Sequence, residues 1–247
     1  MGESKGIFQN RVIICCIAAK TYSMPDYFTH VIAADKIYER MNGDIKHKIK
    51  SRDLYVLGAQ GGDVFFAYNM KWSKTNLGRD LHNKSAVELF KKLYLGNPSY
   101  AAGYATHYAL DCTVHPIVYA YSEGKKSLFA HQNFEMDVGL YVSKFYRMRR
   151  TILPREYVLQ CTSAVYDSIK HIEPSITVTG VERCLKRHFD YTRYLYRNKK
   201  QTYKCQYDFS LLAGVIEEAV DLGVKAAECV LKGDIDPEVF GRDFLQR

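Results

Sequence analysis

The stretch AGYATHYALDCTVHP at residues 102–116, followed by HQNFE at residues 131–135, sets the pattern around which the chain is arranged. His107 precedes Asp111 by four residues, and His131 precedes Glu135 by the same interval. On a helix this spacing puts both side chains on one face, one turn apart, so that an imidazole nitrogen and a carboxylate oxygen can meet at one metal ion. The two phrases therefore predict two helices that each present a pair of metal ligands.

The composition is that of a globular protein with an excess of positive charge. The 247 residues are 47% hydrophobic and 25% charged, which is enough to bury a substantial core. The formal net charge of +8 predicts attraction to an anionic partner, such as a phosphate ester, nucleic acid or an acidic membrane surface. No apolar run approaches the length that spans a bilayer.

The seven cysteines are scattered, odd in number and without a CxxC pair. This usage fits a reducing compartment better than a disulfide framework. We expect buried free thiols, including Cys112, which is out of phase with His107 and Asp111.

Residues 1–23 have two possible interpretations. Lys5 and Arg11 precede a short apolar run ending at Ala18 and Ala19, so the segment weakly resembles a secretory signal. Alternatively it is an N-terminal extension, because Met24 followed by Pro25 would make a natural start just before a helical pattern. We prefer the extension, which predicts a cytoplasmic protein; a secreted protein is the alternative if residues 1–19 act as a signal peptide.

Helical spacing of apolar residues recurs along nearly the whole chain, and no alternating strand pattern of useful length occurs. Residues 54–66 contain three glycines and predict a turn feeding a short buried element, residues 72–80 a polar loop, and the last fifteen residues a loosely packed tail. Pro116 should stop or kink the helix that carries His107 and Asp111 at His115. We therefore predict one all-α, multi-helix domain over residues 24–247, with helices over 26–41, 85–95, 99–114, 128–148, 154–171, 178–197 and 208–232.

The histidines and carboxylates of the first half form a set of residue types that bind zinc at neutral pH. Any single histidine is more often an ordinary hydrogen-bonded imidazole, and an HxxxD pair can simply stabilise a helix. Several histidines and carboxylates that occur together, flanked by glycine and proline, are harder to explain as unrelated imidazoles and helix-stabilising pairs. The candidate metal ligands are His30, Asp63, His82, His107, Asp111, His115, His131 and Glu135.

The order of these motifs resembles the bacterial zinc-dependent phospholipase C family, whose all-helical fold is shared with single-strand-specific zinc nucleases. The resemblance covers roughly residues 24–150. It rests on these phrases: Thr29-His30, LGAQGGD at 57–63, RDLH at 79–82, AGYATHYALDCTVHP at 102–116 and HQNFE at 131–135.

The resemblance implies a zinc site with Asp111 as a bridge, since a carboxylate has two oxygens and can hold two cations. One zinc would be held by Asp63, His82, His107 and Asp111. A second would be held by His115, His131 and Glu135. A third would take His30, Asp111 and the chain's amino terminus, which would be Pro25 if translation begins at Met24. With residues 1–23 attached that last ligand is missing, so the expectation is two or three Zn²⁺ per chain.

The implied activity is hydrolysis of a phosphodiester by a metal-activated water, with Asp63 as the catalytic residue that orients or deprotonates it. A phospholipid is the expected substrate, with possible contact to a membrane surface, and no protein partner is evident. The alternatives are a zinc-dependent single-strand nuclease and a zinc-binding helical protein without catalysis. The tyrosines near the ligands and the basic, aromatic run at 186–200 could contact such substrates, but they could equally be core residues and a solvated helix face.

Overall fold

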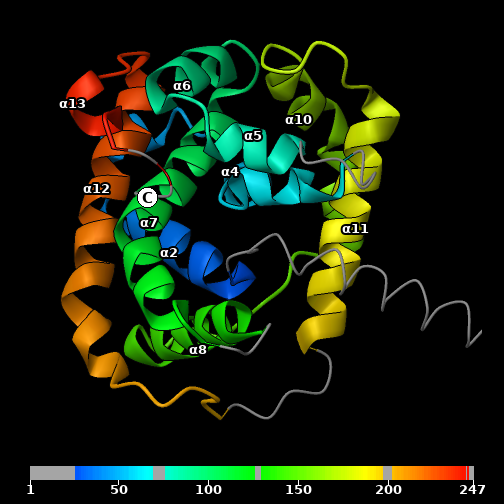
Figure 1. The fold of residues 1–247 in the computed structure, drawn as a ribbon. Helices are drawn as coiled ribbons and strands as arrows, with labels where there is room; N and C mark the ends of the chain where they lie inside the picture. The colour runs from blue at the N-terminus through cyan, green and yellow to red at the C-terminus, as the bar shows by residue number, and fades with distance from the viewer. Residues whose placement is uncertain (1–25, 69–75, 126–128, 197–201, 243, 245–247) are drawn as a thin grey trace, which may run out of the picture.

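Helix α7 (Pro98–Ser122) runs through the middle of the molecule, and α12 (Ala213–Lys232) lies along it as its most extensive partner (Figure 1). The Asn97 side chain accepts a hydrogen bond from the Tyr100 N–H, and Pro98 fills the first helical position, so the sequence specifies the start of α7. Most of α7 is buried around its whole circumference, as expected for a helix that is apolar on every face.

The computed structural model describes residues 26–68, 76–125, 129–196, 202–242 and 244. Within these residues every regular element is helical, so the all-α prediction is confirmed. Residues 1–23, Met24 and Pro25 lie outside the described part, and the predictions made for them stay predictions. The other helices are α2 (Tyr27–Arg40), α3 (Gly43–Lys46), α4 (Arg52–Gly58), the 3₁₀ helix η2 (Gly61–Ala67), α5 (Leu77–His82), α6 (Ala86–Tyr94), α8 (Ala130–Phe145), α9 (Arg155–Gln160), α10 (Thr162–Ile169), α11 (Val178–Tyr196), η3 (Phe209–Leu212) and α13 (Pro237–Phe240).

Of the two outcomes predicted at His115, a stop or a kink, the stop is wrong, because α7 continues through Pro116 to Ser122. The proline ring removes one backbone hydrogen bond. Burial of Val114 and Val118 on either side, and packing of α7 against α8, accompany the continuation. As a result His107, Asp111 and His115 stand on three successive turns of one helix.

Two other boundaries differ from prediction. The expected helix 154–171 is divided at Cys161 into α9 and α10. The expected loop 72–80 ends earlier, because Asn76 caps α5 by accepting a hydrogen bond from the Arg79 N–H, so Asp80 is helical. Residues 54–66, predicted as a turn feeding a short buried element, form the larger part of α4 followed by the 3₁₀ helix η2.

Part of the described C-terminal segment, residues 240–242 and 244, contacts the core, which corrects the prediction of a loose tail for these residues. Phe240 and Phe244 are 2% and 1% exposed. The Tyr108 hydroxyl donates to the Arg242 carbonyl and accepts from the Arg242 N–H, which ties this segment to α7. The sequence does not predict this packing, because two phenylalanines four residues apart are too few to establish a helical repeat of apolar residues.

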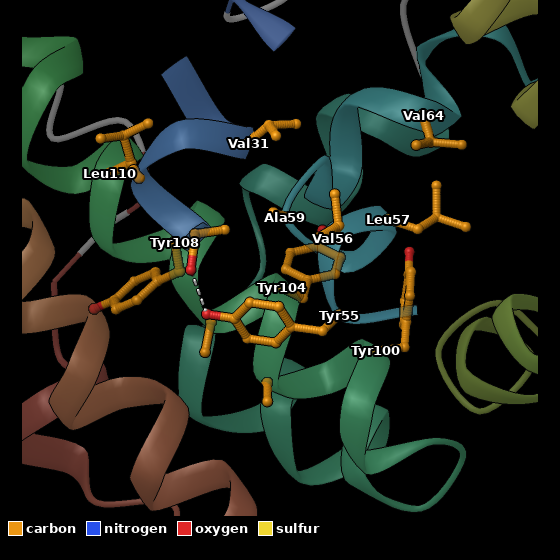
Figure 2. Packing of buried hydrophobic residues seen from close by; sticks show 14 of the residues in the cluster. Val31, Tyr55, Val56, Leu57, Ala59, Val64, Tyr100, Tyr104, Tyr108 and Leu110 are labelled. Carbon is orange, nitrogen blue, oxygen red and sulfur yellow. Dashed lines mark hydrogen bonds between the residues drawn. The ribbon is translucent and has the colours of Figure 1, made fainter. Parts of the chain in front are cut away.

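Helices α4 and α7 approach so closely that their backbones touch. A Cβ at Gly58 would collide with the Tyr100 carbonyl oxygen, and a Cβ at Gly103 with the Tyr55 carbonyl oxygen. Around this contact the rings of Tyr55, Tyr100 and Tyr104 fill the interface (Figure 2). The Tyr55 hydroxyl donates to the Ala34 carbonyl oxygen of α2 at 3.0 Å, so the same cluster fixes a third helix. No helix among the described residues is both long and apolar enough to cross a membrane.

Replacing Gly103 by alanine should lower the free energy of unfolding by about 1–3 kcal/mol, because the new methyl group meets backbone rather than a flexible side chain. Gly214→Ala is the matched control, since that helical position has open space around it and alanine favours a helix. Urea denaturation of both variants checks the prediction, and equal stability of the two would contradict it.

Candidate metal centre

Helix α7 presents three candidate ligands on one face. His107, Asp111 and His115 are separated by four residues each and are 0%, 2% and 3% exposed. Because the helix is not interrupted at Pro116, each side chain lies one turn from the next. The core helix therefore carries a buried line of imidazole, carboxylate and imidazole.

The other five candidate ligands come from elements packed around this face. His30 comes from α2, Asp63 from η2 and His82 from α5. Helix α8 supplies both His131 and Glu135. The structure thus brings together all eight residues that the sequence singled out.

Glycines in η2 make room for the imidazoles. A Cβ at Gly61, whose φ is +50°, would collide with the His107 ring, and one at Gly62 would come within 2.6 Å of the His82 ring. The GGD phrase therefore lets the 3₁₀ backbone lie directly against two histidines and carries Asp63 to them.

The two oxygens of Asp111 face different histidines. Oδ1 lies 3.5 Å from His30 Nε2. Oδ2 lies 3.2 Å from His107 Nε2, 3.5 Å from His82 Nε2 and 3.7 Å from His115 Nδ1. This division is what a carboxylate bridging two cations requires.

The candidate ligand atoms form three groups, each with its members within 4.8 Å of one another: Asp63, His82 and His107; His30, His107 and Asp111; and His115, His131 and Glu135. Four atoms bound tetrahedrally to zinc at its usual bond lengths lie roughly 3.3–3.5 Å apart. The observed separations match this spacing: His82 Nε2 is 3.1 Å from His107 Nε2 and 3.4 Å from Asp63 Oδ1, and His115 Nε2 is 3.6 Å from Glu135 Oε1.

Many of these atoms are buried and make no hydrogen bond within the described residues. Buried polar groups almost always have partners, and leaving one without a partner costs about 1–3 kcal/mol. Nitrogen and oxygen atoms that lie close together without hydrogen bonds are what a metal site requires. Imidazoles and carboxylates are both ordinary zinc ligands, so these residues fit zinc. The atoms are both oxygens of Asp63, both ring nitrogens of His30, Nδ1 of His107 and His115, Oδ2 of Asp111 and Oε2 of Glu135.

Burial and neighbouring charge shift the protonation equilibria of these groups. Burial lowers the pKa of His30 well below its usual value, and the adjacent His107 lowers it further. Burial also opposes charge on His82, but Asp111 and Asp63 together raise its pKa to about 10. Burial alone would raise the pKa of Asp111, yet His107 and His115 hold it well below its usual range. Asp111 is therefore ionised at neutral pH, in the state that binds a cation.

The third group is the one that reaches solvent. The His131 side chain is 19% exposed, and its Nε2 lies 2.7 Å from Glu135 Oε1. The Tyr119 ring, which is half-buried, lies 5.3 Å from the His131 ring. The side chains of the other candidate ligands are 4% exposed or less, so His131 is the most accessible of the eight in the described structure.

Three neighbours of the centre were not predicted as site residues. Phe244 packs its ring 5.7 Å from that of His82. His188 on α11 is buried, and its Nε2 lies 3.3 Å from Gln60 Oε1, in the residue that precedes η2. Asp26 caps α2 four residues before His30. Only Asp26 has a signal that can be read in the sequence, because an aspartate directly before a helical pattern is a common cap residue.

These features define an all-α protein with a buried centre for more than one metal ion. The chain matches the sequence profile described as zinc dependent phospholipase C over residues 29–192, and it belongs to this family. It is thus a zinc-dependent hydrolase, and its buried histidines and carboxylates form three groups that are suited to metal binding. Comparison with curated proteins gave no match. Comparison with solved structures also gave none.

Removing zinc with a chelator should lower the melting temperature, because Asp63, Asp111 and Glu135 would remain buried without a cation. Each zinc position that is saturated at 100 times its Kd contributes about 2.7 kcal/mol, or roughly 5–10 °C in a chain of this size. Differential scanning calorimetry before chelation, after it, and after zinc is restored measures the effect. A melting temperature that does not respond would contradict the fit.

The neutral state of His188 predicts a pH dependence of stability. Burial lowers the pKa of His188 to about 4 from 6.5. The unfolded chain therefore binds a proton that the folded chain excludes, and stability falls as the pH drops from 6.5 toward 4. At pH 5 the loss is roughly 2 kcal/mol. His188→Gln should remove this part of the pH dependence. Urea denaturation of the wild type and the variant at pH 7 and pH 5, with chelator present, measures it. An equal loss of stability between the two pH values in both proteins would be inconsistent with a buried neutral imidazole.

Proposed function

We propose that this protein hydrolyses the phosphodiester of a phospholipid, releasing diacylglycerol and the phosphorylated headgroup. One observation carries the proposal: the two oxygens of Asp111 are divided between His30 on one side and His82, His107 and His115 on the other. A carboxylate placed in this way can hold two cations close together, which is the arrangement that serves phosphoryl transfer.

The proposed ligand sets follow the three groups. Asp63, His82, His107 and Asp111 hold one zinc, His115, His131 and Glu135 a second, and His30 with Asp111 a third. Zinc, when bound, neutralises charge on the phosphodiester and lowers the pKa of a bound water toward 7. The helical protein contributes rigid placement, since the ligands project from packed helices and a 3₁₀ turn rather than from mobile loops.

Asp63 has the further role of holding the attacking water and accepting its proton. Neither of its oxygens makes a hydrogen bond within the described residues, and the carboxylate is 2% exposed. Burial raises its pKa above the usual range despite the nearby His82 and His107. A carboxylate with a raised pKa is a better proton acceptor than one in water.

The exposed edge at His131 supports a lipid substrate. Phe129, two residues before His131, is 48% exposed and offers an apolar surface at the start of α8. Lys125 is exposed just beyond the end of α7, and Lys204 donates to Asn133 Oδ1 at 3.0 Å. Exposed apolar and ammonium groups on the segments that flank the start of α8 suit a phosphate ester that carries acyl chains.

The test compares two substrates with zinc-loaded protein. Release of phosphocholine from phosphatidylcholine vesicles is measured beside release of nucleotides from single-stranded DNA. The proposal predicts headgroup release and little nucleotide release. Cleavage of DNA alone would assign the centre to a nuclease, and zinc-loaded protein that cleaves neither would indicate a site without catalysis toward these bonds.

Asp63→Asn should lower the rate constant for headgroup release by roughly 10²-fold or more at saturating zinc, because the amide cannot accept the water proton. Asp190→Asn is the control, since Asp190 is an exposed carboxylate on α11 that pairs with Arg193. Headgroup assays of both variants, each with its zinc content measured, provide the comparison. An Asp63→Asn enzyme with the activity of the Asp190→Asn control would remove Asp63 from the mechanism.

A further inference from the structure

A small cavity lies between α2, α7 and α8, next to the candidate ligands. Its volume is about 20 Å³, enough for a single water molecule or ion. The walls combine valine and leucine side chains with a polar lining that converges from all three helices. The polar lining consists of Asp26, Thr29, His30, Asp111, His115 and Glu135.

Asp26 is the member of this lining that neither the sequence motifs nor the three ligand groups include. It is 4% exposed, and its Oδ2 accepts hydrogen bonds from both the N–H and the hydroxyl of Thr29, each at 3.0 Å. The bond from the Thr29 N–H satisfies a backbone donor at the start of α2, and this capping uses only one oxygen of Asp26. The other oxygen, Oδ1, is buried and makes no hydrogen bond within the described residues.

The position of Asp26 is fixed from both sides. Thr29 holds Oδ2 from within α2, and α8 presses against the same oxygen, since a Cβ at Gly139 would collide with it. The carboxylate therefore cannot turn out to solvent without moving α8. Asp26 lines the cavity with this fixed carboxylate, whose oxygen Oδ1 has no hydrogen bond to satisfy it among the described residues.

The charges around the cavity call for a cation. Three carboxylates, those of Asp26, Asp111 and Glu135, line a space with room for one small ion. Burying carboxylates together without a counter-charge is strongly unfavourable. The imidazole of His30, whose ring nitrogens make no hydrogen bond to any described residue, offers a neutral ligand to the same space.

We propose that this cavity binds a zinc ion and that Asp26 is one of its carboxylate ligands, together with His30 and Asp111. The proposal rests on the zinc centre described above but not on the identity of the substrate. In this proposal Asp26 is an anionic ligand of the third zinc. It takes the role that the resemblance to the phospholipase C family gave to the amino terminus of the chain. Mixed oxygen and nitrogen donors of this kind are ordinary for zinc.

The experiment counts zinc by inductively coupled plasma mass spectrometry after equilibration of the full chain at a fixed free zinc concentration. Asp26→Asn keeps the cap, since asparagine is as good a cap as aspartate, but it removes the negative ligand. Asp26→Ser also caps, with a side chain too short to reach the cavity. Asp236→Asn is the control, because Asp236 caps α13 through a bond of the same kind, from the Glu238 N–H, in a half-buried position.

We expect three zinc ions in the wild type and the Asp236→Asn control and two in both Asp26 variants, with at least tenfold weaker binding of the last zinc in a titration. Unchanged zinc number and affinity in both Asp26 variants would overturn the proposal while leaving the other two zinc positions intact. A wild type that holds two zinc ions would overturn it as well, since the cavity would then be empty at saturation. A wild type that binds no zinc would overturn both this proposal and the zinc centre as a whole.

Discussion

The carboxylate of Asp111, buried among four histidines, is the constraint on which the rest of this structure depends. Its oxygens lie 3.2–3.7 Å from nitrogens of His30, His82, His107 and His115. Carboxylates are almost never buried unless they are paired or bound to metal, because the loss of hydration is so costly. Helices that meet at this point are therefore arranged around an electrostatic requirement as much as around an apolar core.

The packing of α7 explains how that requirement is met. The helix is buried on all sides, and glycines at its contact with α4 let the two backbones touch, so that side chains on its inner face are held rigidly. Continuation of the helix through Pro116 keeps His115 in phase with Asp111. The rigid line of ligands on α7 then receives single ligands from the shorter elements that pack on it.

The sequence was sufficient to predict the fold class and the set of residues that meet at the centre. Metal ligands on one face of a helix are spaced four residues apart, and nearby glycines and prolines distinguish these pairs from ordinary helical pairs. The failures have physical causes. Pro116 is tolerated inside α7, where packing offsets its lost hydrogen bond, and local propensity cannot show this. The burial of Phe244 against His82 depends on a contact between distant parts of the chain. An aspartate directly before a helix is explained locally as a cap, and the local sequence does not indicate that the second oxygen of Asp26 is buried without a hydrogen bond among the described residues.

The measurement that bears most directly on the bridging role of Asp111 is anomalous X-ray diffraction on either side of the zinc absorption edge, from crystals of the zinc-loaded protein. The structure predicts two zinc peaks in contact with Asp111, one at Oδ1 beside His30 and one at Oδ2 beside His82 and His107. Zinc bound through a single oxygen of Asp111, or zinc found only away from this carboxylate, would contradict the account.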